Sequence, residues 1–271
     1  MINRYKFVLE YDGSKFDSGW QKQRAGLSSV QNSVEEALYN LTKEKVQVYC
    51  AGRTDKGVHA LGQIAHCDFR KPYPLKMLHD GGNSYLRASG CRIRSVAPIG
   101  QDFHARFSAK SKRYEYIISW SRICGVFDLG RVWWINNSTK LDIALIKQEM
   151  QALLGYHDFS SFRDSSCQAA SPMRSIELVH LEHAEDKLIF IFGARSFLHK
   201  QIRIMVGTLI DIGRGRLSKS IQEILESRNR SAAGQTAPGC GLYLKSIQYQ
   251  DDEACTTDLA IQSCFDDQGG A

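Results

Sequence analysis

A single carboxylate in a glycine-flanked turn is the group in this sequence best placed to do chemistry. Asp55 lies between two glycines in the segment AGRTDKGVHA, residues 51–60. Glycine permits the positive φ values of a tight loop, so the turn can present the carboxylate at the rim of a cleft. Arg53 and Lys56 favour the ionised form, which can act as a nucleophile. The alternative is structural, because Asp in such turns often caps its own backbone.

Two strand-like runs enclose this turn and must position it. The run VQVYC leads in over residues 46–50, and VHALGQIAHCDF leads out over residues 58–69. Because β-branched and aromatic residues favour strands, the sequence predicts a hairpin whose connection carries Asp55.

The rest of the chain alternates strand and helix patterns. Strands are expected over residues 4–11, 113–120, 176–182, 187–193 and 242–249. Helices are expected from Ser28 or Ser29, over 141–154, over 198–212, and from Ser218 or Ser220. Strands outnumber helices and several form hairpins, so the predicted class is α+β with an antiparallel sheet. The order strand, helix, hairpin occurs in both halves.

The charge of the chain is unevenly distributed. The 271 residues carry a net charge of +6, but residues 251–271 contain six acidic residues and no Lys or Arg. Residues 1–250 therefore carry +12, which fits a polyanionic partner such as a nucleic acid. The alternative is a basic protein with no such partner. The acidic tail is expected to be poorly ordered.

Several protein classes are disfavoured by the sequence. It has no run of 18 apolar residues, so no membrane span is expected, and its first residues lack the apolar core of a signal peptide. The eight cysteines include no C-x-x-C pair, which favours reduced thiols in a cytoplasmic protein. His180 and His183 would face opposite sides of a strand, so no zinc site is expected. The chain also lacks a nucleotide-binding glycine signature.

The ten residues around Asp55 closely resemble the catalytic loop of the tRNA pseudouridine synthase A family. In that family the aspartate is the nucleophile that isomerises uridine within RNA. The resemblance extends over roughly residues 4–250. The segments that carry it are YDGSKF at 11–16, DFHARF at 102–107, KRYEY at 112–116, DFSSFR at 158–163, GARSFLHKQIRIMVG at 193–207 and APGCGLY at 237–243.

The resemblance implies a fold, a substrate and an assembly. The fold consists of two related α+β subdomains, residues 1–108 and 109–250, followed by the acidic tail 251–271. Their antiparallel sheets join, with helices on one side and a basic cleft between the halves. The family modifies tRNA in the anticodon stem-loop, at tRNA positions 38–40, as a homodimer and without a cofactor. The isomerisation needs neither redox chemistry nor an external group, which agrees with the absence of a cofactor.

The resemblance also assigns roles to side chains far apart in the sequence. Asp55 corresponds to the nucleophile, Tyr114 to the active-site tyrosine, and Arg203 to the arginine that pairs with the aspartate. The Tyr114 ring can stack on a base that has left the helix, and its phenol can take part in proton transfer. Four basic residues are candidates for tRNA contacts: Arg53, Arg106, Lys112 and Arg113.

Taken alone, these residues also allow simpler interpretations. Tyr114 could be ordinary sheet packing, and Tyr116, two residues on, shares its face. Arg203 could lie on the solvent side of an amphipathic helix, and the four basic residues could be solvated surface. His59 and His199 could line the cleft and are given no role.

Two other functions are compatible with the sequence. The chain could be a tRNA-binding protein or tRNA-folding chaperone in which Asp55 is structural. A glycosidase would need a second positioned acid, and none is evident near Asp55. The chain departs from the family pattern at an extra residue near Asp17 and Ser18, at Arg87 and at Ser196, which bears on RNA positioning more than on chemistry.

Overall fold

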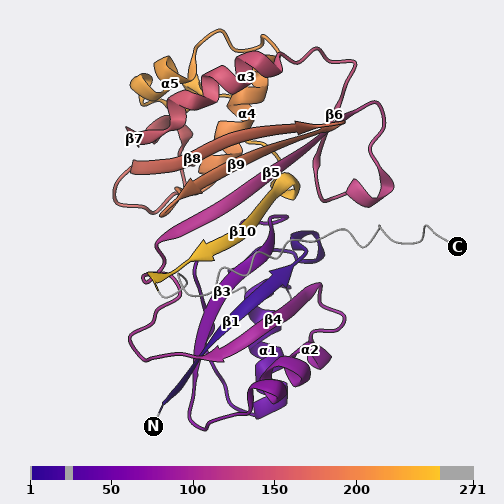
Figure 1. Ribbon diagram of the computed structural model, residues 1–271, viewed down its shortest axis with the longest axis vertical. Helices are drawn as coiled ribbons and strands as arrows, with labels where there is room; N and C mark the ends of the chain where they lie inside the picture. The colour runs from indigo at the N-terminus through magenta and orange to yellow at the C-terminus, as the bar shows by residue number, and fades with distance from the viewer. Residues whose placement is uncertain (1, 22–26, 251–271) are drawn as a thin grey trace, which may run out of the picture.

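The computed structural model describes residues 2–21 and 27–250. Within them, ten strands form one sheet in the order β4-β1-β3-β10-β5-β9-β8-β7, with β2 beside β3 and β6 beside β5 (Figure 1). The strands are β1 Asn3–Tyr11, β2 Tyr49–Cys50, β3 His59–Phe69, β4 Cys91–Pro98, β5 Ser111–Ser121, β6 Trp133–Asn136, β7 Gly155–Asp158, β8 Met173–Ala184, β9 Lys187–Ala194 and β10 Leu242–Gln248. The helices are α1 Val30–Thr42, α2 Gly82–Tyr85, α3 Ile143–Glu149, α4 Gln201–Gly213 and α5 Ile221–Ser227.

The predicted α+β class is confirmed. Most neighbouring strands pair antiparallel, while β10 with β3 and β5 with β6 pair parallel. Figure 1 places α1 and α2 beside the first half of the sheet, and α3, α4 and α5 beside the second half. Two of the expected helix starts resolve to Ser29 and Ser220, whose side chains cap α1 and α5.

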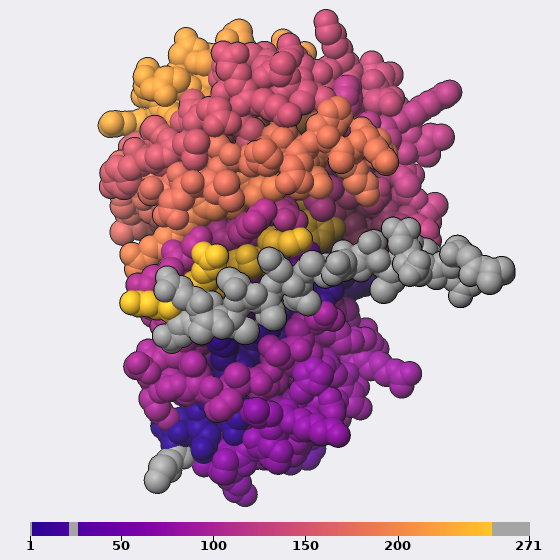
Figure 2. All heavy atoms as spheres, viewed as in Figure 1, coloured from indigo at the N-terminus to yellow at the C-terminus, as the bar shows by residue number. Residues whose placement is uncertain are grey.

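Strand β10 joins the two halves of the sheet. It lies between β3 of the first half and β5 of the second, although it is the last strand in the chain. Figure 2 shows its yellow atoms between the purple atoms of the first half and the magenta and orange atoms of the second. The segment just before β10 is therefore brought against the loop that follows β2. The expected boundary near residue 108 falls between β4 and β5, and the subdomain division stays a prediction.

Helix α4 is the most buried helix. Eleven of its thirteen residues are buried, including both faces of the helix. Its apolar side chains pack with Phe190, Phe192 and Tyr116 in the main core. Each large aliphatic or aromatic side chain removed from water in this way contributes about 1.5–3 kcal/mol. A helix buried on all sides has no solvent face, so the side chain of its single arginine, Arg203, must lie in the interior.

The differences from expectation concern short elements. The strand expected over 46–50 is only the two residues of β2, because the pairing with β3 covers only Tyr49 and Cys50. The helix expected over 141–154 is α3 followed by a 3-10 turn that ends at Leu153. Strands β4, β6 and β7 were not expected, and β6 and β7 have only four residues each, too few for a clear alternating pattern. The acidic tail lies outside the described residues.

Candidate active site

The loop that carries Asp55, residues 51–57, is held by side chains from three strands. Tyr11 of β1 hydrogen-bonds to the Thr54 hydroxyl at 2.9 Å. Gln63 of β3 donates to the carbonyl of Gly52 at 2.7 Å, and Lys112 of β5 donates to the carbonyl of Ala51 at 2.6 Å. Since these partners lie on strands of one sheet, the backbone that leads into Asp55 is fixed relative to both halves of the molecule.

Close backbone packing also holds the loop. The amide of Trp20 donates to the carbonyl of Thr54 at 3.1 Å, and Trp20 is 1% exposed. A Cβ on the neighbouring Gly19 would lie 1.9 Å from the same carbonyl oxygen, so this approach requires glycine. Gly57 has a φ of +79°, as expected for the end of a tight turn. Gly19 and Trp20 thus support the Asp55 loop through close backbone packing.

Both oxygens of the Asp55 carboxylate accept hydrogen bonds from side chains of the second half. Arg203 donates through a terminal guanidinium nitrogen to Oδ2 at 2.7 Å, and His199 lies with Nε2 3.0 Å from Oδ1. The Asp55 side chain is 23% exposed, so it is held from one side and open on another. A carboxylate positioned in this way can reach a bound reactant without first being reoriented.

Arg203 lies in the interior, not on a solvent face. Its side chain is 14% exposed, and its Nε donates to the carbonyl of Ala237 at 2.8 Å while its terminal nitrogen reaches Asp55. The guanidinium therefore links α4, the segment before β10 and the Asp55 loop. The solvent-face interpretation of Arg203 fails because α4 has no exposed side at this point.

His199 is a functional candidate that the sequence left without a role. It lies between β9 and α4, with Nδ1 3.1 Å from the Ser166 hydroxyl and 3.5 Å from a carboxylate oxygen of Asp164. His59 has a different position, since it is 2% exposed and stacks on Tyr243 with the ring centroids 4.6 Å apart. Burial lowers the pKa of His59, in keeping with a neutral structural imidazole.

Asp164 is a second carboxylate near Asp55, which the sequence did not reveal. Burial opposes its ionisation, but hydrogen bonds from Lys200 and Ser166 outweigh this and hold the pKa of Asp164 well below its usual range. Lys200 donates to it at 2.8 Å. A carboxyl group that stays ionised cannot serve as the general acid that glycoside hydrolysis requires, so Asp164 does not revive the glycosidase alternative.

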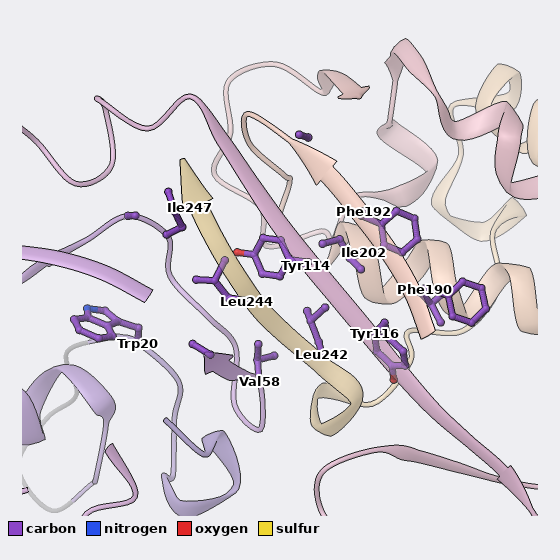
Figure 3. Close-up of a cluster of buried hydrophobic side chains, with 14 of the residues drawn as sticks. Trp20, Val58, Tyr114, Tyr116, Phe190, Phe192, Ile202, Leu242, Leu244 and Ile247 are labelled. Atoms are coloured by element: carbon purple, nitrogen blue, oxygen red, sulfur yellow. The ribbon is translucent and has the colours of Figure 1, made fainter. Parts of the chain in front are cut away.

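Tyr114 and Tyr116 leave β5 on the same face but have different environments. The Tyr116 hydroxyl donates to the carbonyl of Pro238 at 2.7 Å, and the residue is fully buried. Tyr114 is 8% exposed, packs edge-to-face on Phe197 at 5.4 Å, and has its hydroxyl close to Gly52 of the Asp55 loop. Figure 3 shows the two hydroxyls pointing in different directions. Burial, together with the nearby Asp55 charge, raises the pKa of Tyr114 and keeps its phenol protonated.

Lys112 is buried beside Tyr114 rather than exposed for phosphate contact. It is 8% exposed, and its ammonium donates to the carbonyl of Ala51. Burial lowers the pKa of Lys112 to about 8. The structure thus places this sequence-predicted substrate contact inside the protein, where it supports the Asp55 loop.

Lys112 should make stability depend on pH in an alkaline window. Between pH 8 and the ordinary lysine value of about 10.5, the unfolded chain binds this proton more than the folded chain, so stability rises with pH. The gain is on the order of 3 kcal/mol across the window. Urea unfolding at pH 7.5 and pH 10 should show this gain in the wild type relative to Lys112→Met. An equal pH response in both proteins would contradict the burial of the charge.

The other predicted tRNA contacts are exposed and dispersed. Arg53 lies on the Asp55 loop, and Arg106 lies over the ring of Phe107 at 5.6 Å. Arg113 follows Lys112 on β5, so its side chain emerges on the sheet face opposite Tyr114. The structure therefore brings Asp55, Tyr114 and Arg203 together, with Arg53 beside them, and leaves Arg106 and Arg113 outside this group.

The segments that carry Asp55, His199 and Arg203 also match a known family, whereas Tyr114 and Lys112 on β5 lie between the two matched ranges. A family model described as tRNA pseudouridine synthase matches residues 8–108 and 150–250, which contain Asp55 and Arg203. The chain belongs to this family. The tRNA pseudouridine synthase A of Wolbachia pipientis wMel is 42% identical over 91% of this chain and 100% of its own length. The protein of the same name from Rhodospirillum centenum is 42% identical over 92% of this chain and 100% of its own length.

Membership of the tRNA pseudouridine synthase A family makes the chain an isomerase. In the described parts of the chain, no helix is both long and apolar enough to cross a membrane. The same residues contain no group of three or more His, Cys, Asp or Glu side chains arranged to hold a metal ion.

Proposed function

We propose that this protein isomerises uridine to pseudouridine in the anticodon stem-loop of tRNA, at tRNA positions 38–40, with Asp55 as the nucleophile and without a cofactor. The single observation that carries the proposal is the Asp55 carboxylate held by Arg203 at 2.7 Å on a loop fixed to both halves of the sheet. Relatives named tRNA pseudouridine synthase A support the choice of substrate.

The chemistry makes limited demands on the protein. The N1–C1′ bond of uridine breaks, the base turns, C5 bonds to C1′, and the C5 proton is lost while N1 gains one. Asp55 stabilises or traps the ribose, and Arg203 compensates its charge. Tyr114 has its hydroxyl beside the Asp55 loop, where the phenol can take part in proton transfer and the ring can stack on a base taken out of the RNA helix.

We also propose the assembly and the site of action. The protein acts as a homodimer in the cytoplasm, as the family resemblance implies. Arg53, Arg106 and Arg113 contact tRNA phosphates, and Lys112 assists from within by holding the Asp55 loop. Phosphate contacts of this kind make binding weaken as salt is raised, which a titration of tRNA affinity against salt measures directly.

Mapping of the product tests the proposal. Unmodified tRNA is incubated with the protein without added cofactor, and pseudouridine is located by carbodiimide labelling and primer extension. Stops at tRNA positions 38–40 support the reaction and the site together. Salt-sensitive tRNA binding without any stop would instead favour the tRNA-binding or chaperone function, with a structural Asp55.

Substitutions of the two tyrosines of β5 should have different effects on rate and on stability. Tyr114→Phe removes the phenol beside the Asp55 loop and is expected to lower the single-turnover rate by about 10²-fold or more. Tyr116→Phe removes a buried hydrogen bond to Pro238 and should cost about 1 kcal/mol of stability with little change in rate. Single-turnover kinetics and urea unfolding measure both. Similar rate losses in the two variants would contradict the assignment of Tyr114.

A further inference from the structure

His199 contacts the proposed nucleophile directly, and the residues behind it fix its ring. Its Nε2 lies 3.0 Å from Oδ1 of Asp55, while Nδ1 faces the Ser166 hydroxyl at 3.1 Å and Asp164 at 3.5 Å. The carboxylate of Asp164 also accepts a hydrogen bond from Lys200 at 2.8 Å. The imidazole therefore bridges two carboxylates, one reactive and one held in place by a lysine.

Counting the available protons defines the donors in this network. The Asp55 carboxylate can only accept, so His199 must carry a proton on Nε2. The Ser166 hydroxyl also lies at hydrogen-bond distance from Asp164 and has one proton to donate there. The hydroxyl oxygen can then accept from Nδ1 of His199, which lies 3.1 Å away. In this arrangement His199 faces Asp55 as a fixed donor backed by the negative charge of Asp164.

The backbone next to His199 is unusual in a way that fits this role. Lys200 has a φ of +58° at the start of α4, a conformation that side-chain-bearing residues adopt at a cost of about 1–3 kcal/mol. The same lysine reaches Asp164, and the amide of Asp164 donates to the carbonyl of His199 at 3.3 Å. Two contacts thus join Asp164 to residues 199 and 200, and together they hold the His199 side chain towards the Asp55 loop.

We propose that His199 is a positioning residue for the nucleophile, held in its donor orientation by Asp164 and Ser166; this inference rests on the proposed function of Asp55. Arg203 fixes one carboxylate oxygen and His199 the other, so the two donors together determine the plane of the carboxylate. A misplacement of about 1 Å in a reacting group can cost about 10²-fold in rate. His199 therefore acts through Asp55 and need not touch the RNA.

A comparison of two substitutions at His199 tests the proposal. The amide nitrogen of His199→Gln can reach the position of Nε2 and keep the donor to Asp55. That of His199→Asn reaches only the position of Nδ1, so the contact with Asp55 is lost. The expected single-turnover rate at saturating tRNA falls about 10- to 100-fold for His199→Asn and stays within about 5-fold of wild type for His199→Gln. The affinity for tRNA stays within about 2-fold for both.

Three outcomes would overturn the proposal. These are wild-type rates for His199→Asn, equal rate losses in the two variants, or a loss of tRNA affinity with an unchanged saturated rate, which would indicate an RNA contact.

A second measurement tests whether Asp164 holds the His199 ring in place. Asp164→Asn should lower the rate in the wild type but have no further effect in His199→Gln, because glutamine does not need the charge of Asp164. Equal effects in both backgrounds would show that Asp164 acts independently.

The failure of this inference is distinguishable from the failure of the proposed function. If Asp55→Asn remains active, the nucleophile assignment fails and the role of His199 fails with it. If Asp55→Asn is inactive but His199→Asn is fully active, only the positioning role is rejected. Thermal unfolding of each variant shows whether any loss of rate follows a loss of folded protein.

Discussion

Asp55→Asn is expected to lower the single-turnover rate of pseudouridine formation by at least about 10³-fold while tRNA affinity stays within several-fold of wild type. The amide has nearly the shape of the carboxylate but is a very poor nucleophile. The change also removes one negative charge from a basic chain, so binding to tRNA should not weaken. Single-turnover assays and filter binding with the same tRNA measure the two quantities.

The geometry adds a structural consequence to this substitution. Both carboxylate oxygens of Asp55 accept hydrogen bonds, from Arg203 and from His199. In Asp55→Asn the amide group must direct its nitrogen, a donor, at one of these donors. The variant should therefore lose some stability as well as activity, and its fold must be checked by circular dichroism. A folded Asp55→Asn protein with wild-type turnover would reject Asp55 as the nucleophile.

The strands and helices could largely be predicted from the sequence, because local patterns determine them. The alternation over residues 4–11 and the hairpin of β8 and β9 depend on side-chain periodicity alone. The position of β10 between β3 and β5 could not be predicted in this way, since no local pattern reveals which distant strands pair. Yet this placement brings the Pro238 segment against the Asp55 loop and so completes the site.

The candidate site shows the same division between local pattern and tertiary environment. Asp55 stands out in the sequence because the residues that form its turn are its immediate neighbours in the chain. Lys112 was interpreted as a surface contact because sequence does not reveal that its ammonium is buried under the Ala51 carbonyl. Asp164 was missed because it approaches Asp55 only through His199. A polar histidine at the start of a largely apolar helix was the one signal available for this network.

Loss of the Arg203 guanidinium should be the second largest effect. Arg203→Gln leaves Asp55 with a single side-chain donor and leaves the carbonyl of Ala237 without its donor at 2.8 Å. The expected rate loss is about 10²- to 10³-fold. The expected loss of stability is on the order of 2 kcal/mol, below that of a fully buried pair because Asp55 is partly exposed. Arg203→Lys should be intermediate, since one ammonium cannot satisfy two separate acceptors.

A double-mutant cycle shows whether the guanidinium acts through Asp55. In the Asp55→Asn background, Arg203→Gln should cost clearly less stability than in the wild type, because the charge that it compensates is already gone. Arg216→Gln is the matched control, since Arg216 is exposed beyond the end of α4 and the change in net charge is the same. Arg216→Gln should leave both rate and stability nearly unchanged. If Arg203→Gln costs the same stability in both backgrounds, its contribution comes from α4 and the Ala237 segment, and the ion pair with Asp55 is not what holds the two halves of the site together.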